Sequence, residues 1–269
     1  MIKRTFTSAV IAVLVYAWLL FSYIPLIIHI GTVLLGLLAV FEILRICKTD
    51  NPKNCYAAMM LSALLLILPI PQYEYVMMLI LPVALILFGF MMAGKERIQN
   101  FNATFATVVS VAVVLLFKAI PTLRDWDNGF YYLTFAVTAC FVTDVAALLF
   151  GKAFGSHMLC PKISPKKTVE GAVGGLSCTA IIAIIATILL QKYTGLHFDV
   201  ISFVIWAVLV SIVGQFGDLC MSSVKRACKI KDFGNIFPGH GGMLDRFDSQ
   251  LLVVPFTLLY RELTGGHIR

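Results

Sequence analysis

Residues 5–41 read TFTSAVIAVLVYAWLLFSYIPLIIHIGTVLLGLLAVF and contain no Asp, Glu, Lys or Arg, although Arg4 precedes them and Glu42 follows. A membrane-spanning helix needs about 20 mostly apolar residues. The stretch is therefore long enough for two spans, and Pro25 offers the break between them because proline cannot continue a helix. A cleaved signal peptide over residues 1–24 is the alternative, but the apolar run is longer than is usual for one and lacks a clear cleavage site. We expect spans near residues 6–23 and 26–44.

The composition places the rest of the chain in a bilayer as well. Of the 269 residues, 60% are hydrophobic and 13% are charged, and the mean hydropathy is +0.93. An ordinary soluble domain is about 25% charged, so this balance excludes a soluble enzyme, a disordered regulator and a nucleic-acid-binding domain. Further apolar runs lie at about 55–70, 75–93, 103–118, 130–150, 171–190, 200–217 and 248–262. We predict an all-α, polytopic integral membrane protein with about nine transmembrane helices.

The basic residues predict how these helices are oriented. We number the segments outside the predicted spans from the amino terminus, starting at zero. The even-numbered segments hold 16 of the 21 Lys and Arg residues, and the odd-numbered segments hold five. Cytoplasmic loops carry the Lys and Arg excess, so we expect a cytoplasmic amino terminus and an external carboxyl terminus. The two longest polar loops, 151–170 and 218–247, then lie in the cytoplasm. None of the seven cysteines falls in a predicted outer loop, and we expect all of them to be reduced.

We treat residues 1–269 as a single membrane domain with three parts. Four amino-terminal spans occupy residues 1–100, and the middle helices with the first polar loop occupy 101–170. The carboxyl-terminal helices and the second polar loop occupy 171–269, and there we expect catalysis.

The second loop begins with a polar stripe. If the helix of the eighth predicted span continues past residue 217, four polar residues three or four positions apart share one of its faces. They provide an acid, a hydroxyl and two ammonium groups, which could hold a metal ion and phosphates. The alternative is a solvated helix end whose lysines reach the lipid headgroups. The four residues are Asp218, Ser222, Lys225 and Lys229.

A glycine-rich turn and two aspartates follow this stripe. Residues 238–242 read PGHGG, which ends the helix and lets backbone amides approach a phosphate closely; a simple turn is the alternative. Asp245 and Asp248 then open the last apolar run, where two carboxylates are costly unless they are paired or bind a cation. Helix capping accounts for one of them but not for both. A hard cation such as Mg²⁺ suits carboxylates better than zinc does.

The first loop offers a second anion-binding pattern. Lys166 and Lys167 are adjacent and are flanked by Ser164, Pro165 and Thr168, which together could clamp a phosphate. Lysines that face anionic lipid headgroups are the alternative.

Asp144 lies inside the sixth predicted span, near its cytoplasmic end. A carboxylate within the membrane is a functional candidate by default, although it could simply pair with a lysine. The glycine pairs at 151 and 155 and at 171 and 175 are spaced as in helices that pack closely.

The second loop resembles the signature of the phosphatidate cytidylyltransferases, also called CDP-diacylglycerol synthases. The matching pattern is Ser222-x-Val224-Lys225-Arg226-x4-Lys231-Asp232-x-Gly234-x2-Phe237-Pro238-x-His240-Gly241-Gly242-Met243-x-Asp245-Arg246-Phe247-Asp248. The first loop is similar to that family's second conserved block through Ser164-Pro165-Lys166-Lys167-Thr168-x-Glu170-Gly171. The chain departs from the family near Asp144, with Val145, Leu148 and Ser156 at positions where the family often has hydroxyl, aromatic and basic residues.

The resemblance implies the reaction and the residues that carry it. CTP and phosphatidic acid would give CDP-diacylglycerol and pyrophosphate, with Mg²⁺ and a second cation such as K⁺ as cofactors. The implied catalytic residues are Asp218, Asp245, Asp248, Lys225 and Arg226, and the three aspartates would bind the metal. The implied substrate-binding residues are Ser164, Lys166, Lys167, Thr168, Ser222, His240, Gly241, Gly242, Arg246 and Asp144.

The same resemblance implies a homodimer. We expect the protein in a bacterial inner membrane, and the distribution of Lys and Arg predicts that the active site faces the cytoplasm. Two other functions remain open on the sequence. One is a related transferase that acts on another lipid or a polyprenol phosphate. The other is a multi-span transporter, which would need polar residues along its spans, where this chain has almost none except Asp144.

Overall fold

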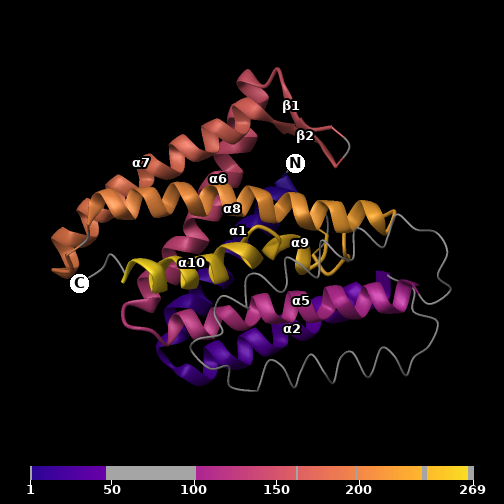
Figure 1. Cartoon of the computed structure of the whole chain (residues 1–269), viewed down its shortest axis with the longest axis horizontal. Coiled ribbons are helices and arrows are strands. Elements are labelled where there is room, and N and C mark those ends of the chain that lie inside the picture. Colours follow the sequence, from indigo (N-terminus) through magenta and orange to yellow (C-terminus); the bar gives the residue numbers. More distant parts are fainter. Residues whose placement is uncertain (1, 47–100, 162, 198, 238–240, 266–269) are drawn as a thin grey trace.

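The computed structural model describes residues 2–46, 101–161, 163–197, 199–237 and 241–265 (Figure 1). Two of the predicted spans, at 55–70 and 75–93, lie outside the described residues, as does His240. The described chain is mostly helical, in agreement with the predicted fold class.

The described elements follow one another along the chain from α1 to α10. They are α1 (Ile2–Leu20), a short 3₁₀ helix (Phe21–Tyr23), α2 (Pro25–Ile46), α5 (Phe101–Arg124), α6 (Gly129–Phe154), β1 (Met158–Cys160), β2 (Ser164–Thr168), α7 (Val169–Thr194), α8 (Val200–Ala227), α9 (Leu244–Phe247) and α10 (Gln250–Thr264). The predicted break at Pro25 is confirmed, because this proline takes the first position of α2, where its missing N–H costs no hydrogen bond.

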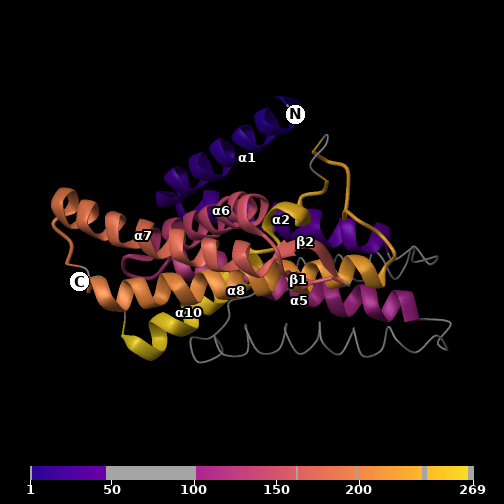
Figure 2. The ribbon, with the colours of Figure 1, turned by 90° about the horizontal axis from the view of Figure 1, so that it is seen from above.

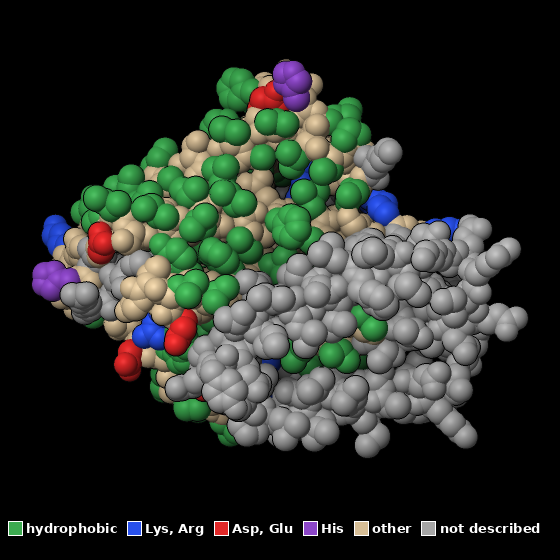
Figure 3. Space-filling view, in the orientation of Figure 1, with side chains coloured by type: hydrophobic (Ala, Val, Ile, Leu, Met, Phe, Trp, Pro, Cys, Tyr) green, Lys and Arg blue, Asp and Glu red, His purple; other side chains and the backbone are tan. Residues whose placement is uncertain are grey.

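Four of the described helices are long and apolar enough to cross a membrane: Pro25–Ile46, Gly129–Phe154, Val169–Thr194 and Val200–Arg226. Large apolar side chains of α7 are exposed, among them Val173, Ile181, Ile185 and Ile188. Figure 3 shows hydrophobic side chains spread over this face of the molecule. Such a surface suits lipid rather than water, and the chain is an integral membrane protein.

Helices α6, α7 and α8 pack side by side because small and hydroxyl residues line their contacts. A Cβ atom on Gly171 would lie 2.6 Å from the carbonyl oxygen of Ala147, so only glycine admits this approach of α7 to α6. Deeper in the bundle, the Thr143 hydroxyl is 2.8 Å from those of Thr179 and Ser211, which joins the three helices. The predicted packing role of the glycines is thus confirmed at residue 171.

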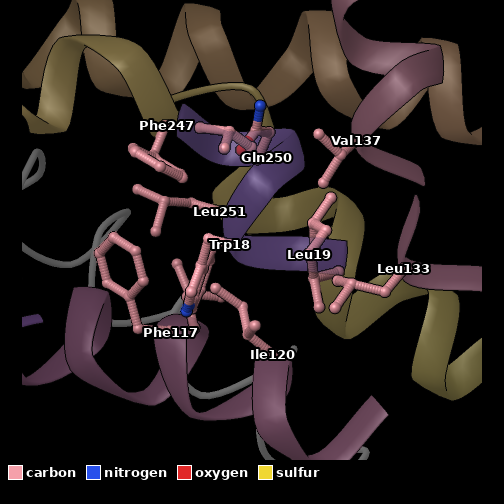
Figure 4. A pocket seen from close by; sticks show the side chains of 12 residues that line it. Trp18, Leu19, Phe117, Ile120, Leu133, Val137, Phe247, Gln250 and Leu251 are labelled. Atoms are coloured by element: carbon pink, nitrogen blue, oxygen red, sulfur yellow. The ribbon is translucent and has the colours of Figure 1, made fainter. Parts of the chain in front are cut away.

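The remaining helices form a second group in which α2 packs against α5, and α10 against α5 and α8. Seen from above, α1 runs obliquely along one side of the other described helices (Figure 2). Figure 4 shows the apolar contact between α1, α5, α6 and the α9–α10 segment, where Phe247 points toward Phe117 with ring centroids 6.0 Å apart. The cavity there has a volume of only about 20 Å³ and an almost wholly apolar lining, so it is a packing gap rather than a substrate site.

A two-stranded hairpin connects α6 to α7 at one end of this helix pair (Figure 1). Strand β1 pairs antiparallel with β2, with Met158 opposite Thr168 and Cys160 opposite Ser164. The sequence predicts only a polar loop here. The difference arises because strands of three and five residues are too short to show a periodic apolar pattern.

Candidate active site

The two predicted polar loops meet at the end of α8. Lys167, on strand β2, forms an ion pair with Asp218 of α8. The guanidinium of Arg226 donates from Nε to the carbonyl oxygen of Ile163, at 3.2 Å, and from a terminal nitrogen to that of Ile230, at 3.0 Å. Arg226 therefore joins the hairpin to the segment after α8, a role that the sequence did not predict for it.

The polar stripe on α8 forms as predicted for three of its four residues. The helix continues to Ala227, and the Ser222 hydroxyl donates to the carboxylate of Asp218 at 3.2 Å. One turn further on, the ammonium of Lys225 lies 2.9 Å from Asp245 and 3.7 Å from Asp248. Lys229 is not on the stripe, because the helix has ended and this residue adopts a left-handed backbone conformation with φ of +56°.

Asp245 organises the glycine-rich loop. Its Oδ2 atom accepts backbone hydrogen bonds from Phe233, at 2.7 Å, and Gly242, at 2.9 Å, while Oδ1 contacts Lys225. Only 3% of the Asp245 side chain is exposed. Gly241, with φ of +83°, makes the turn that brings Gly242 to this carboxylate.

A second group of carboxylates surrounds Ser249. The Ser249 hydroxyl donates to Asp144 of α6 at 3.2 Å, and its backbone N–H donates to Asp248 at 2.9 Å. Asp248 lies in the short link between α9 and α10. The fold thus brings Asp144 to the signature segment.

A pocket of about 280 Å³ lies where α6, the hairpin, α7 and α8 meet. Its polar side is formed by Asp144, Lys166, Lys167, Thr168, Gln215 and Asp218. Leucine and alanine side chains from α6, β1 and α7 form the apolar side. Thr168 also caps α7, since its hydroxyl accepts the N–H of Gly171 at 3.1 Å. The pocket therefore offers cationic groups next to an apolar wall.

Two further predicted site residues, Ser164 and Arg246, do not line the pocket. Ser164 begins β2, and Arg246 is half-buried on α9. Sequence reasoning missed Ser249, Gln215 and the buried Glu42 of α2, which contacts the signature loop. The signal available for Glu42 was its position as the charge that ends a long apolar run.

Carboxylate oxygens are suitable ligands for a hard cation. In this structure, however, lysine ammonium groups already form ion pairs with these carboxylates. Asp218 faces Lys167, while Asp245 and Asp248 share Lys225. In the described part of the chain, no three His, Cys, Asp or Glu side chains lie close enough together to ligate one ion. A divalent ion would therefore need these carboxylates to exchange their lysine partners for the metal.

Comparisons with known proteins agree on one family. The profile of the "Cytidylyltransferase family" matches residues 2–264. A Staphylococcus epidermidis protein named "Phosphatidate cytidylyltransferase" is 32% identical over 256 residues, and a Bacillus subtilis protein of the same name is 32% identical over 263 residues. A Staphylococcus saprophyticus protein, also of that name, is 34% identical over 259 residues. Each match covers 94% of this chain and 95% of the relative.

Proposed function

Because this chain belongs to the cytidylyltransferase family, we propose that the pocket at the end of α8 is where it transfers the cytidylyl group of CTP to phosphatidic acid. The products are CDP-diacylglycerol and pyrophosphate. The observation that carries the assignment to this pocket is the Lys167–Asp218 ion pair, which joins the two polar loops beside an apolar wall.

The reaction needs charge neutralisation more than it needs a base. A phosphomonoester has a second pKa near 6, so phosphatidate is mostly a dianion at neutral pH. One of its phosphate oxygens attacks the α-phosphorus of CTP, and the bond from that phosphorus to the leaving pyrophosphate breaks. In phosphoryl transfer the protein contributes mainly positioning and electrostatic stabilisation. The two lysines that line the pocket suit that task.

We assign the phosphate contacts to basic and hydroxyl groups from both loops. Lys166 and Lys167 line the pocket directly, while Lys225 and Arg226 reach phosphates from the end of α8. Arg226 retains donors beyond the two that hold backbone carbonyls, since a guanidinium has five. Further contacts are proposed for Ser164, Thr168, Ser222, Asp144, His240, Gly241, Gly242 and Arg246.

We propose Mg²⁺ as the cofactor, held by Asp218, Asp245 and Asp248, with K⁺ as a second cation. Their oxygens are the hard ligands that Mg²⁺ prefers, and each of these carboxylates already lies against a positive charge. When bound, the ion neutralises triphosphate charge and stabilises the leaving pyrophosphate. Lys167 and Lys225, released from their carboxylates, would then be available to the phosphates.

For the membrane arrangement, we propose nine spans with the amino terminus and the active site in the cytoplasm, in a bacterial inner membrane. The distribution of the 21 Lys and Arg residues supports this orientation. CTP would then enter from the cytoplasm, while phosphatidate would arrive laterally with its acyl chains still in the bilayer. A homodimer is proposed from the family resemblance alone.

The test uses purified protein in detergent–phosphatidate micelles with radiolabelled CTP. We expect label to enter chloroform-soluble lipid when phosphatidate is present and not when an isoprenoid phosphate replaces it. The incorporation should stop with EDTA and return with excess Mg²⁺ or Mn²⁺. Label incorporated only with the isoprenoid phosphate would overturn the substrate, and full activity in EDTA would overturn the metal.

A further inference from the structure

Glu42, near the carboxyl-terminal end of α2, carries a buried carboxylate that contacts the signature loop. Only 2% of the residue is exposed. Its Oε1 atom accepts the backbone N–H of Met243 at 2.8 Å, and Oε2 accepts that of Leu244 at 2.9 Å. Among the described residues, no Lys, Arg or His forms an ion pair with Glu42. A buried carboxylate is costly unless its oxygens are satisfied, and these two amides satisfy both oxygens.

Two glycines of the signature make room for this carboxylate. A Cβ atom on Gly234 would lie 2.5 Å from Oε1 of Glu42. A Cβ atom on Gly242 would overlap the same carboxyl group, lying 2.6 Å from its carbon. Real Cβ atoms essentially never approach so closely. The approach of Glu42 is therefore enough to require glycine at both positions.

The loop is thus held between two carboxylates. Glu42 binds the amides of residues 243 and 244, and Asp245 binds those of Phe233 and Gly242 while it also contacts Lys225. We propose that Glu42 is a positioning residue for cytidylyl transfer, which fixes the loop so that the carboxylate of Asp245 stays beside the end of α8. This inference rests on the proposed function of the pocket. It makes the amino-terminal helix α2 part of the active-site framework.

The first test replaces Glu42 with Gln, which keeps the size of the side chain but replaces one acceptor oxygen by a donor. We expect kcat to fall about tenfold, because an amide is left without its charged partner, and KM for CTP to change by no more than about twofold. Hydrogen exchange of the amides of Met243 and Leu244 should become faster. Thr32→Val is the matched control, since Thr32 is buried on the same helix and its hydroxyl donates to Ile28 of that helix, at 2.8 Å.

The second test uses size compensation between the carboxylate and the glycine. Gly242→Ala should be almost inactive because its Cβ meets Glu42, and the additional change Glu42→Asp, which shortens the acid, should restore part of kcat. If Glu42→Gln does not fold, the comparison of Gly242→Ala with the double variant tests the role of Glu42 instead. Unchanged kcat and exchange in Glu42→Gln, or a double variant no more active than Gly242→Ala, would overturn the inference. Absence of CDP-diacylglycerol formation by the unmodified protein would instead overturn the proposed function, whereas the exchange result concerns Glu42 alone.

Discussion

At the scale of single residues, each of the three aspartates proposed as metal ligands has a different environment. Asp218 is partly exposed, with 22% of its side chain accessible, and it faces the pocket. Asp245 is buried and holds the loop through two backbone amides. Asp248 shares Lys225 with Asp245 and accepts from Ser249. Replacing each of them should therefore disturb the protein in a different way, although all three carry the same chemical group.

The substitution Asp245→Asn should lower both the stability of the fold and the affinity for the metal ion. The substitution keeps an oxygen for the amides of Phe233 and Gly242 but removes the buried ion pair with Lys225, which should cost about 3 kcal/mol of stability. The Mg²⁺ concentration for half-maximal activity should rise as well. Asp218→Asn should raise that concentration with little loss of thermal stability, because its ion pair is partly exposed.

Melting temperature and Mg²⁺ titration of the two variants check this distinction. A stability loss within the roughly 0.3–1 kcal/mol of a helix-terminus charge, with activity retained at limiting Mg²⁺, would make Asp245 a simple helix cap.

Replacing Lys166 and Lys167 together with Gln should lower catalysis but not stability. Both lysines line the pocket, and charged hydrogen bonds to phosphate contribute enough for a loss of about tenfold or more in kcat/KM. The Lys167–Asp218 pair is exposed enough that its loss should barely change the melting temperature. Lys192→Gln, at the other end of α7, is the control. Unchanged turnover at subsaturating CTP and at subsaturating phosphatidate would assign the two lysines to lipid headgroups.

At the scale of helices and strands, the sequence was informative where a long pattern was present. The run from residue 5 to residue 41, interrupted by Pro25, predicted two helices. The spacing along α8 predicted three of the four residues of its polar stripe, but not that the helix ends before Lys229. The hairpin was missed because its strands are too short for a pattern. Glu42 and Ser249 were missed because their partners lie far away along the chain, and only the fold brings them together.

The α6–α7 contact provides a prediction at this scale. In Gly171→Ala the new Cβ would meet the carbonyl oxygen of Ala147 and the hydroxyl of Thr168, so the helices would have to separate. Such overpacking typically costs about 1–3 kcal/mol, and the pocket above the contact should lose activity with it. Thermal unfolding in detergent measures the cost. Ser177→Ala, on the exposed side of α7, should change neither property, and an equally stable Gly171→Ala variant would contradict the close packing.

At the scale of the whole molecule, the site combines parts from distant regions of the chain. Helix α2 supplies Glu42, α6 supplies Asp144, the hairpin supplies Lys167, and α8 with the following loop supplies the rest. The apolar face of α7 extends away from this polar end (Figure 3). This separation suits an enzyme with one substrate in water and the other in the bilayer.

The charge distribution predicts the proposed orientation of the molecule in the membrane. Reporter fusions at residues 160 and 235 should both give cytoplasmic signals, and a fusion at the carboxyl terminus should give an external one. Position 160 lies on β1, and position 235 lies in the loop after α8. An external signal at either internal position would contradict the proposed topology.

The contact between Glu42 and Met243 also constrains how the protein is made. The two residues are 201 positions apart, and at about 5–20 residues per second the ribosome needs roughly 10–40 s to proceed from one to the other. During that interval Glu42 does not yet have the backbone N–H groups of Met243 and Leu244 as hydrogen-bond partners. Glu42 can hold the loop only after residues 243 and 244 have been made, so a nascent chain that stops before them lacks this contact.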